Sequence, residues 1–498
     1  MPGEPTEPDP RAPVLIGVGE VADRTPQGVV GRDPIALMAE ALRRADADAA
    51  GGWLGRLDDL AVVQQIGWPD LNPAAERVAT ALGVAPKRTV QSPLPHGDQP
   101  TRLLCEAAAR IARGEATVCA VVGAEALRSA KARSDRGGFA LSAGLQDELA
   151  RLSPDGVALS YGLALPTSVY PLYENALRAR LGQTLAEAQT ETACLWSGLS
   201  EVAAAHEAAW LKQPLPPEAI VTPGPGNPPI SHPYTKRQVA NASVNQGAGC
   251  LLTSYGAARA AGLPRDALVF VGASAAASEP EAILARDAYD RSASLEVVLS
   301  EALQRAALTA DEIDHAELYS CFPCVPKMAL RALGWPLDRP ITQYGGLTFG
   351  GGPIGNAMGH AIAGMVRRLR ASGGHGLIHA NGGYMTENHA VVLSARAPRG
   401  DPGADPDVQA QADALRGLVP PLDPEATGPA RIETYTVGYG PDGRPSGGVV
   451  IARTEAGART LARVPSDDPS LVAALTDGRA EPIGTMGRVA PDRLWQTA

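Results

Sequence analysis

Side chains that can move protons or bind a charged oxygen gather in four short segments, residues 96–98, 319–321, 359–360 and 379–383. These segments hold three histidines, a tyrosine, an asparagine and an aspartate, and His96, Asp98, His360 and Asn381 each stand next to a glycine. Imidazole takes up and releases protons near neutral pH. Hydroxyl, amide and imidazole N–H groups stabilise an oxygen that gains negative charge. The segments therefore favour proton transfer next to a polarised carbonyl.

Each candidate also has a structural interpretation, and the sequence leaves both open. His96 and Asp98 precede a helical pattern, and Asp98 in particular suits a helix cap. Tyr319 suits the end of a strand packed into the core. His360 suits an amphipathic helix on which a neighbouring residue satisfies its imidazole.

The remaining motifs exclude several kinds of site. Cys321 and Cys324 form a Cys-x-x-Cys pair, but neither a second pair nor a thioredoxin-like context accompanies it, so we expect no metal site. The glycines at 345–355 allow the backbone to approach a ligand closely. No nucleoside-triphosphate or dinucleotide fingerprint is present. We expect no cofactor of either kind.

Composition limits the partners and the compartment. The 498 residues carry a net charge of −10 and 4% aromatic residues, which disfavours nucleic-acid binding. The first eleven residues do not resemble a secretory signal, and no apolar run approaches the ~18 residues of a membrane helix. Six scattered cysteines suggest reduced thiols. We expect a cytoplasmic protein without membrane insertion.

Strand and helix patterns alternate in two parts of the chain, which predicts an α/β fold with a largely parallel sheet. A glycine-rich loop, an alanine-rich helix and a strand follow one another at 97–123 and again at 350–383, which suggests an internal duplication. Residues 125–265 lose this alternation. From Ala430 the pattern becomes all-β, with a Pro-Asp-Gly turn between two alternating segments.

Several segments together resemble one family. They are SHPYTKRQVANASVNQGAG, ELYSCFP, GGLTFGGGPIGNAMGHAIAGMVRRLRA and ANGGYMTENHA, with ARIETYTVGYGPDGRPSGGVVIAR in the tail. The chain resembles the thiolase superfamily. Within it, the chain is most similar to the sterol-carrier-protein-type branch and its type 1 thiolase-like proteins, which have an additional C-terminal domain.

The resemblance implies a five-layered αβαβα thiolase fold, built from two duplicated βαβ halves and a loop domain, with a small all-β, OB-like domain at the end. It implies these boundaries: a disordered tail at 1–12, an N-terminal half at 13–124 and 240–265, a loop domain at 125–239, a C-terminal half at 266–398, a linker at 399–429 and the additional domain at 430–498.

The resemblance also implies a function in lipid metabolism. It points to an acetyl-CoA acetyltransferase-like acyltransferase with a CoA thioester as substrate or ligand and no other cofactor. Thiolases begin their long buried helix with a nucleophilic cysteine, and that position falls near Gly97 here. We therefore expect carbon–carbon cleavage or condensation without an acyl-enzyme. The alternative is an inactive CoA-binding module. The family contains dimers and monomers, so a homodimer stays one of two options.

Motif by motif, the resemblance places Tyr319 to Phe322 at the family's His-Asp-Cys-Phe motif and Gly359-His360 at its Gly-His-Pro motif. Residues 379–383 fall at its second Cys-x-Gly motif. The expected catalytic residues are His96, Tyr319, His360, His379 and Asn381. The expected substrate contacts are Gly97, Asp98, Ser320, Cys321, Gly351, Gly352, Asn356, Gly382 and Gly383.

Overall fold

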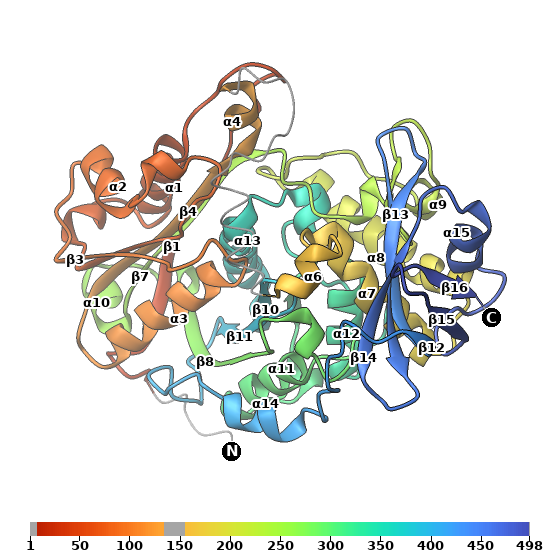
Figure 1. Ribbon diagram of the computed structural model, residues 1–498. Helices are drawn as coiled ribbons and strands as arrows, with labels where there is room; N and C mark the ends of the chain where they lie inside the picture. Colours follow the sequence, from red (N-terminus) through yellow and green to blue (C-terminus); the bar gives the residue numbers. More distant parts are fainter. Residues whose placement is uncertain (1–6, 134–154, 498) are drawn as a thin grey trace.

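The computed structural model describes residues 7–133 and 155–497 (Figure 1). Residues 1–6 of the expected tail, and 134–154 of the expected loop domain, lie outside the described residues. The rest of the tail contacts the N-terminal half. The Gly256 N–H donates to the Pro10 carbonyl at 2.7 Å, and the Tyr255 N–H donates to the Ala12 carbonyl at 2.8 Å.

A nine-stranded sheet runs through the core in the order β3-β2-β4-β7-β1-β8-β11-β10-β9. Its strands are β1 (Pro13–Ala22), β2 (Asp59–Val62), β3 (Arg88–Gln91), β4 (Val118–Ala126), β7 (Asn245–Ser254), β8 (Val269–Ser278), β9 (His315–Leu318), β10 (His375–Gly382) and β11 (Glu387–Ser394). Only β2 with β3 and β4, and β9 with β10, pair in parallel. The expected largely parallel sheet is therefore wrong. The sheet is mixed because β7 and β11 each run back beside the preceding parallel pair.

The two halves of the sheet have the same strand order, which confirms the internal duplication. In the first half β1, β7, β4 and β2 lie side by side, and β8, β11, β10 and β9 repeat this order in the second. The halves join where β1 pairs with β8, at Val14–Phe270 and Leu15–Val269.

Helices cover both faces of the two halves and give the five layers of the αβαβα fold. In the middle, α3 (Gln99–Ala112) and α13 (Ala357–Ser372) pack against each other and against strands of both halves. On the outside, α1 (Pro34–Asp48) covers the first half and α11 (Ala293–Arg305) the second. The contact of α1 with β1 requires glycine at two positions, because a Cβ on Gly17 or Gly19 would lie 2.0 Å from a carbonyl oxygen of α1.

A group of helices between β4 and β7 forms the loop domain and packs beside the C-terminal half (Figure 1). It contains α6 (Gly156–Ser160), α7 (Pro166–Arg180), α8 (Leu185–Ala205), α9 (Pro217–Val221), β5 (Pro229–Ser231) and β6 (Tyr234–Thr235). Outside this group, the described residues also form α2 (Ala75–Leu82), α4 (Leu127–Arg133, directly after β4), α10 (Tyr255–Ala260), α12 (Cys324–Ala332) and α14 (Gln409–Leu415). None of the helices within residues 7–133 and 155–497 is long and apolar enough to cross a membrane.

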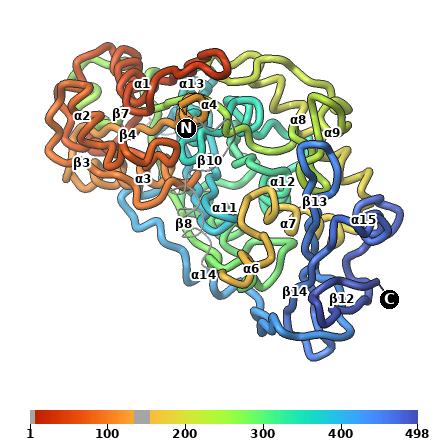
Figure 2. The backbone as a smooth tube through the Cα atoms, turned by 45° about the horizontal axis from the view of Figure 1, so that its top comes forward, coloured from red at the N-terminus to blue at the C-terminus, as the bar shows by residue number. Residues whose placement is uncertain are grey.

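The C-terminal residues form a small barrel at the end of the molecule farther from the N-terminal half (Figure 2). Its elements are β12 (Gly428–Tyr439), β13 (Pro445–Thr454), β14 (Arg459–Val464), α15 (Pro469–Thr476), β15 (Met486–Val489) and β16 (Trp495–Thr497). The order β14-β13-β12-β15-β16 closes through a parallel bridge between Arg463 and Leu494. Five closed strands with a helix after the third confirm the expected OB-like domain. The barrel packs against α7, where the Thr434 hydroxyl donates to the Leu172 carbonyl at 2.6 Å.

A buried ion pair fixes α7 to the C-terminal half. The Lys327 ammonium lies 2.7 Å from Glu174, and both side chains are 2% exposed. The Tyr234 hydroxyl donates to the second Glu174 oxygen at 2.9 Å. We expect Lys327→Met to lower the free energy of unfolding by about 3–5 kcal/mol, because it leaves an uncompensated buried carboxylate. Urea unfolding measures this loss. Lys327→Met with Glu174→Leu should recover most of it, and an equal loss in the double variant would contradict the ion-pair account.

Candidate functional site

An apolar cavity of about 370 Å³ lies between α7 and the core layers. Leu165, Tyr170, Phe322, Leu347 and Ile354 form much of its wall. Of the residues expected in the site, the structure brings eight to this cavity: His96, Gly97, Tyr319, Cys321, Gly352, Asn381, Gly382 and Gly383. They come from the loop before α3, the end of β9, the segment before α13 and the end of β10. The cavity can therefore hold an apolar chain with a few polar groups around it.

The hydroxyl of Tyr319 occupies the space that a side chain at position 97 would need. A Cβ built on Gly97 would lie 2.0 Å from Tyr319 Oη and 2.6 Å from the Asn381 carbonyl oxygen. Burial raises the pKa of Tyr319 well above its usual value, so the hydroxyl keeps its proton. A protonated phenol is a hydrogen-bond donor, and here it stands close to the N-terminus of α3.

The Asn381 amide is held in place by its neighbours. The Tyr170 hydroxyl lies 3.1 Å from Asn381 Oδ1, and the Asn381 amide nitrogen lies 3.3 Å from Asn388 Oδ1. Tyr170 in turn stacks on Phe322 with ring centroids 4.4 Å apart. Sequence reasoning missed Tyr170, because α7 lies some 150 residues before the motif at Phe322 and no spacing links the two.

A cluster of imidazoles and carboxylates stands beside the cavity. His96 Nδ1 lies 3.0 Å from Glu387 Oε2, and His389 Nδ1 lies 3.6 Å from Asp98 Oδ2. Burial alone would raise the pKa of Asp98, but hydrogen bonding and the charge of His389 bring it below its usual value. Asp98 stands at the N-cap of α3, yet its side chain does not cap the helix. The carboxylate is turned to the cluster instead, which favours a functional over a capping interpretation.

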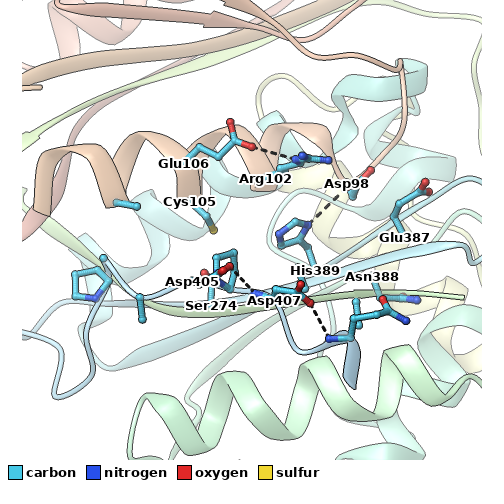
Figure 3. A pocket seen from close by; sticks show the side chains of 18 of the residues that line it. Asp98, Arg102, Cys105, Glu106, Ser274, Glu387, Asn388, His389, Asp405 and Asp407 are labelled. Atoms are coloured by element: carbon cyan, nitrogen blue, oxygen red, sulfur yellow. Dashed lines mark hydrogen bonds and ion pairs between the residues drawn. The ribbon is translucent and has the colours of Figure 1, made fainter. Parts of the chain in front are cut away.

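Part of the cluster also lines a larger polar groove of about 810 Å³ (Figure 3). Asp98, Glu387 and His389 line the groove, whereas His96 lines the cavity. Ligand atoms of His96, Asp98 and Glu387 all lie within 4.8 Å of one another, so these three are candidate metal ligands. Glu387 and His389 were not among the expected site residues. Glu387, Asn388 and His389 form a run of polar residues at the start of β11, which pairs with the motif at 379–383. This run was the signal that could have identified Glu387 and His389.

The structure does not bring His360 to the cavity. Helix α13 begins at Ala357, so His360 lies one turn inside it and its Nδ1 lies 2.6 Å from Glu20 Oε1 on β1. Burial would raise the pKa of Glu20, but the hydrogen bond and charge of His360 contribute to lowering it to about 2. Asn356 stands at the start of α13 instead and donates through its amide to the Gly123 carbonyl.

Three other expected residues also lie behind the cavity wall. His379 is fully buried in β10, with Nε2 3.0 Å from Asn388 Oδ1. Ser320 Oγ accepts from the Leu347 N–H at 3.3 Å. A Cβ on Gly351 would lie 2.0 Å from Gln246 Oε1, so this glycine is needed for packing. These three residues support the site from outside.

The buried imidazole of His379 makes stability depend on pH. Burial lowers its pKa from 6.5 to about 4, so the unfolded chain binds a proton there at a pH where the folded chain does not. The free energy of unfolding therefore falls as the pH decreases from 6.5 towards 4, by at most about 3 kcal/mol. We expect thermal unfolding of His379→Gln to show a smaller loss of Tm over this range. An unchanged slope would contradict this assignment.

Comparisons with known proteins agree with this architecture. Residues 407–493 match the family model described as the thiolase-like protein type 1 additional C-terminal domain. A monomeric SCP2-thiolase like protein type 1 from Mycobacterium smegmatis superposes with a TM-score of 0.81 and 29% identity, over 97% of this chain and 98% of that one. The chain is similar to the type 1 thiolase-like proteins over nearly its whole length, and its C-terminal residues match their additional domain. No curated protein sequence matches it.

More distant structures share the fold of this thiolase-like protein. The Ltp2-ChsH2(DUF35) aldolase superposes with a TM-score of 0.60 and 20% identity, over 77% of this chain and 98% of that one. Human mitochondrial 3-ketoacyl-CoA thiolase in complex with CoA superposes with a TM-score of 0.57 and 15% identity, over 77% and 98%. At these identities the likeness shows the thiolase fold.

Proposed function

We propose that this thiolase-like protein makes or breaks a carbon–carbon bond next to the carbonyl of a CoA thioester, through an enolate and without an acyl-enzyme. The observation that carries this proposal is the Tyr319 hydroxyl in the space beside Gly97, where thiolases are expected to hold their nucleophilic cysteine. A hydrogen-bond donor there serves an oxygen that gains charge rather than a carbon under attack.

The thiol in the cavity wall does not replace the missing nucleophile. Burial raises the pKa of Cys321 to about 12, so the sulfur keeps its proton at neutral pH. The Cys105 thiol, which lines the polar groove, has its pKa raised to about 12 by burial as well. An acyl-enzyme through either sulfur is therefore disfavoured.

In the cleavage direction, the substrate is a 3-hydroxyacyl thioester. In the tautomer that carries its proton on Nδ1, His96 donates to Glu387, and Nε2 then accepts the proton of the 3-hydroxyl group. The bond between C2 and C3 breaks, C3 leaves as an aldehyde or ketone, and the electron pair moves onto the thioester oxygen. The Tyr319 hydroxyl stabilises this enolate oxygen. The imidazolium then returns its proton to C2, and the shorter acyl thioester is released.

Two observations support a CoA thioester as the substrate. The cavity wall is mostly apolar, which suits an acyl chain, and a solved protein of the same fold is described in complex with CoA. Carbon–carbon chemistry is in keeping with another protein of this fold that is described as an aldolase. The similar protein from M. smegmatis is described as monomeric, so a homodimer stays only a prediction.

The absence of a cysteine at position 97 also fits a second candidate function, an inactive CoA-binding module. One experiment separates the two. The protein is incubated with 3-hydroxyacyl-CoA and 3-oxoacyl-CoA thioesters of increasing length, and the small molecules and the intact protein are weighed by mass spectrometry. Shorter acyl-CoA products without an acyl adduct on the protein are the expected result. An adduct would contradict the enolate route, and binding without turnover would favour the module.

A further inference from the structure

The cluster beside the cavity brings two carboxylates together with two imidazoles. Asp98 is 1% exposed and Glu387 is half-buried, and both carboxylates point toward the space next to Gly382. A Cβ on Gly382 would lie 2.5 Å from Asp98 Oδ1 and 2.9 Å from Glu387 Oε2. Two carboxylates this close repel each other unless cations balance them. One divalent ion between the two carboxylates would supply that balance.

We propose that His96, Asp98 and Glu387 bind a divalent transition-metal ion such as Zn²⁺, and that the bound ion competes with proton transfer by His96. The ligand atoms of the three residues lie within 4.8 Å of one another. One imidazole nitrogen with two carboxylate oxygens is a donor set that Zn²⁺ accepts, at bond lengths of about 2.0–2.2 Å. The set leaves a further coordination position, as sites with three protein ligands do.

Neighbouring residues already orient the ligands. Asp98 Oδ2 lies 3.6 Å from His389 Nδ1, and the Gln99 amide nitrogen lies 3.2 Å from Asp98 Oδ1. Figure 3 shows His389 joined to Asp98 across the groove, with Glu387 beside them. Partners of this kind hold metal-binding carboxylates in place. The positive N-terminal end of α3 opposes a cation at Asp98, but this effect is weak beside three direct ligands.

The sequence alone predicts no metal site, because Glu387 lies almost 300 residues after His96. The fold joins them, since the loop before α3 meets the start of β11. An ion on Nδ1 of His96 would displace the hydrogen bond to Glu387 and leave the proton on Nε2. The imidazole could then no longer accept a proton. The competition with catalysis rests on the proposed function, whereas metal binding itself does not.

The test titrates the full-length protein with Zn²⁺ by calorimetry, and with Co²⁺, whose visible absorption reports the coordination number. We expect one ion per chain. Asp98→Asn and Glu387→Gln should each weaken binding at least ~100-fold, and His389→Gln about 10-fold. Glu106→Gln is the matched control, because Glu106 lines the same groove but lies outside the cluster. It should bind the ion as the unchanged protein does.

The outcomes decide the proposal without any turnover assay. The proposal is overturned if the unchanged protein does not bind Zn²⁺. It is also overturned if the Asp98→Asn and Glu387→Gln variants both bind Zn²⁺ as the unchanged protein does, with an unchanged Tm. Binding that Glu106→Gln also loses would assign the ion to the groove and overturn the proposed ligand set. If turnover is found, added Zn²⁺ should inhibit it and a chelator should restore it. Turnover that Zn²⁺ leaves unchanged would overturn the competition.

Discussion

Replacing Gly97 with cysteine should not convert this protein into a thiolase. The new Cβ would lie 2.0 Å from the Tyr319 hydroxyl oxygen, so either the phenol or the helix start has to move. Overpacking of this kind costs about 1–3 kcal/mol of unfolding free energy, and more where the surroundings are rigid. We expect a lower Tm, no acyl adduct in the intact-mass spectrum, and loss of the proposed carbon–carbon activity.

Two further variants make this prediction specific. Gly97→Ala should reproduce the loss of stability, whereas Gly198→Ala should not, because nothing lies within 4 Å of a Cβ at position 198 in α8. Combining Gly97→Cys with Tyr319→Ala removes the contact with the phenol and leaves the Asn381 carbonyl oxygen, 2.6 Å from the new Cβ, as the remaining close contact. The thiol then stands next to the N-terminus of α3, where the helix dipole lowers its pKa. This double variant should react with iodoacetamide faster than the unchanged protein. A single Gly97→Cys variant that is stable and acylated would contradict the interpretation of Tyr319.

Much of the fold could be predicted from local patterns. The repeat of loop, helix and strand at 97–123 and 350–383 corresponds to α3 with β4 and α13 with β10. Alternation after Ala430 predicted the β-rich domain. The direction of the strands could not be predicted in the same way. Whether β7 and β11 run parallel or antiparallel to their neighbours depends on long connections, and no local pattern encodes that choice.

One position in the site could be predicted from the end of a helix, by counting residues back along it. Counting back from the helix end at Gly114 pointed to Gly97, which lines the cavity. The match to the Gly-His-Pro motif selected His360 as a catalytic residue, but the structure places His360 one turn inside α13, with Asn356 at the helix start. The segment before α13 contains a π-helical turn at 346–350 and a 3-10 turn at 354–356, and both change how many residues reach the helix start. A glycine-rich sequence does not show which turns it adopts.

The partners of the predicted residues were harder to find than the residues themselves. Tyr170 and Glu387 reach the site from α7 and β11, far from His96 in sequence. Tyr170 contacts the site through its hydroxyl oxygen and Glu387 through Oε2. A sequence gives the type of each side chain but not the direction in which it points. The sequence also allowed Asp98 to be a helix cap, because only the structure shows that its side chain turns to His389.

The largest loss of activity is expected at His96. His96→Ala should lower kcat at least about 10³-fold, because it removes the group that accepts and returns the proton. His96→Gln should be as inactive, since an amide does not accept a proton at neutral pH. Added imidazole should partly restore His96→Ala but not His96→Gln, where the side chain still fills the space. Steady-state kinetics with the thioester identified by mass spectrometry measure these effects.

His375→Gln, at the half-buried start of β10 and outside the cavity, is the control and should keep full activity. Full activity in His96→Gln, with an unchanged Tm, would remove His96 from the mechanism and leave Tyr319 as a donor without a base.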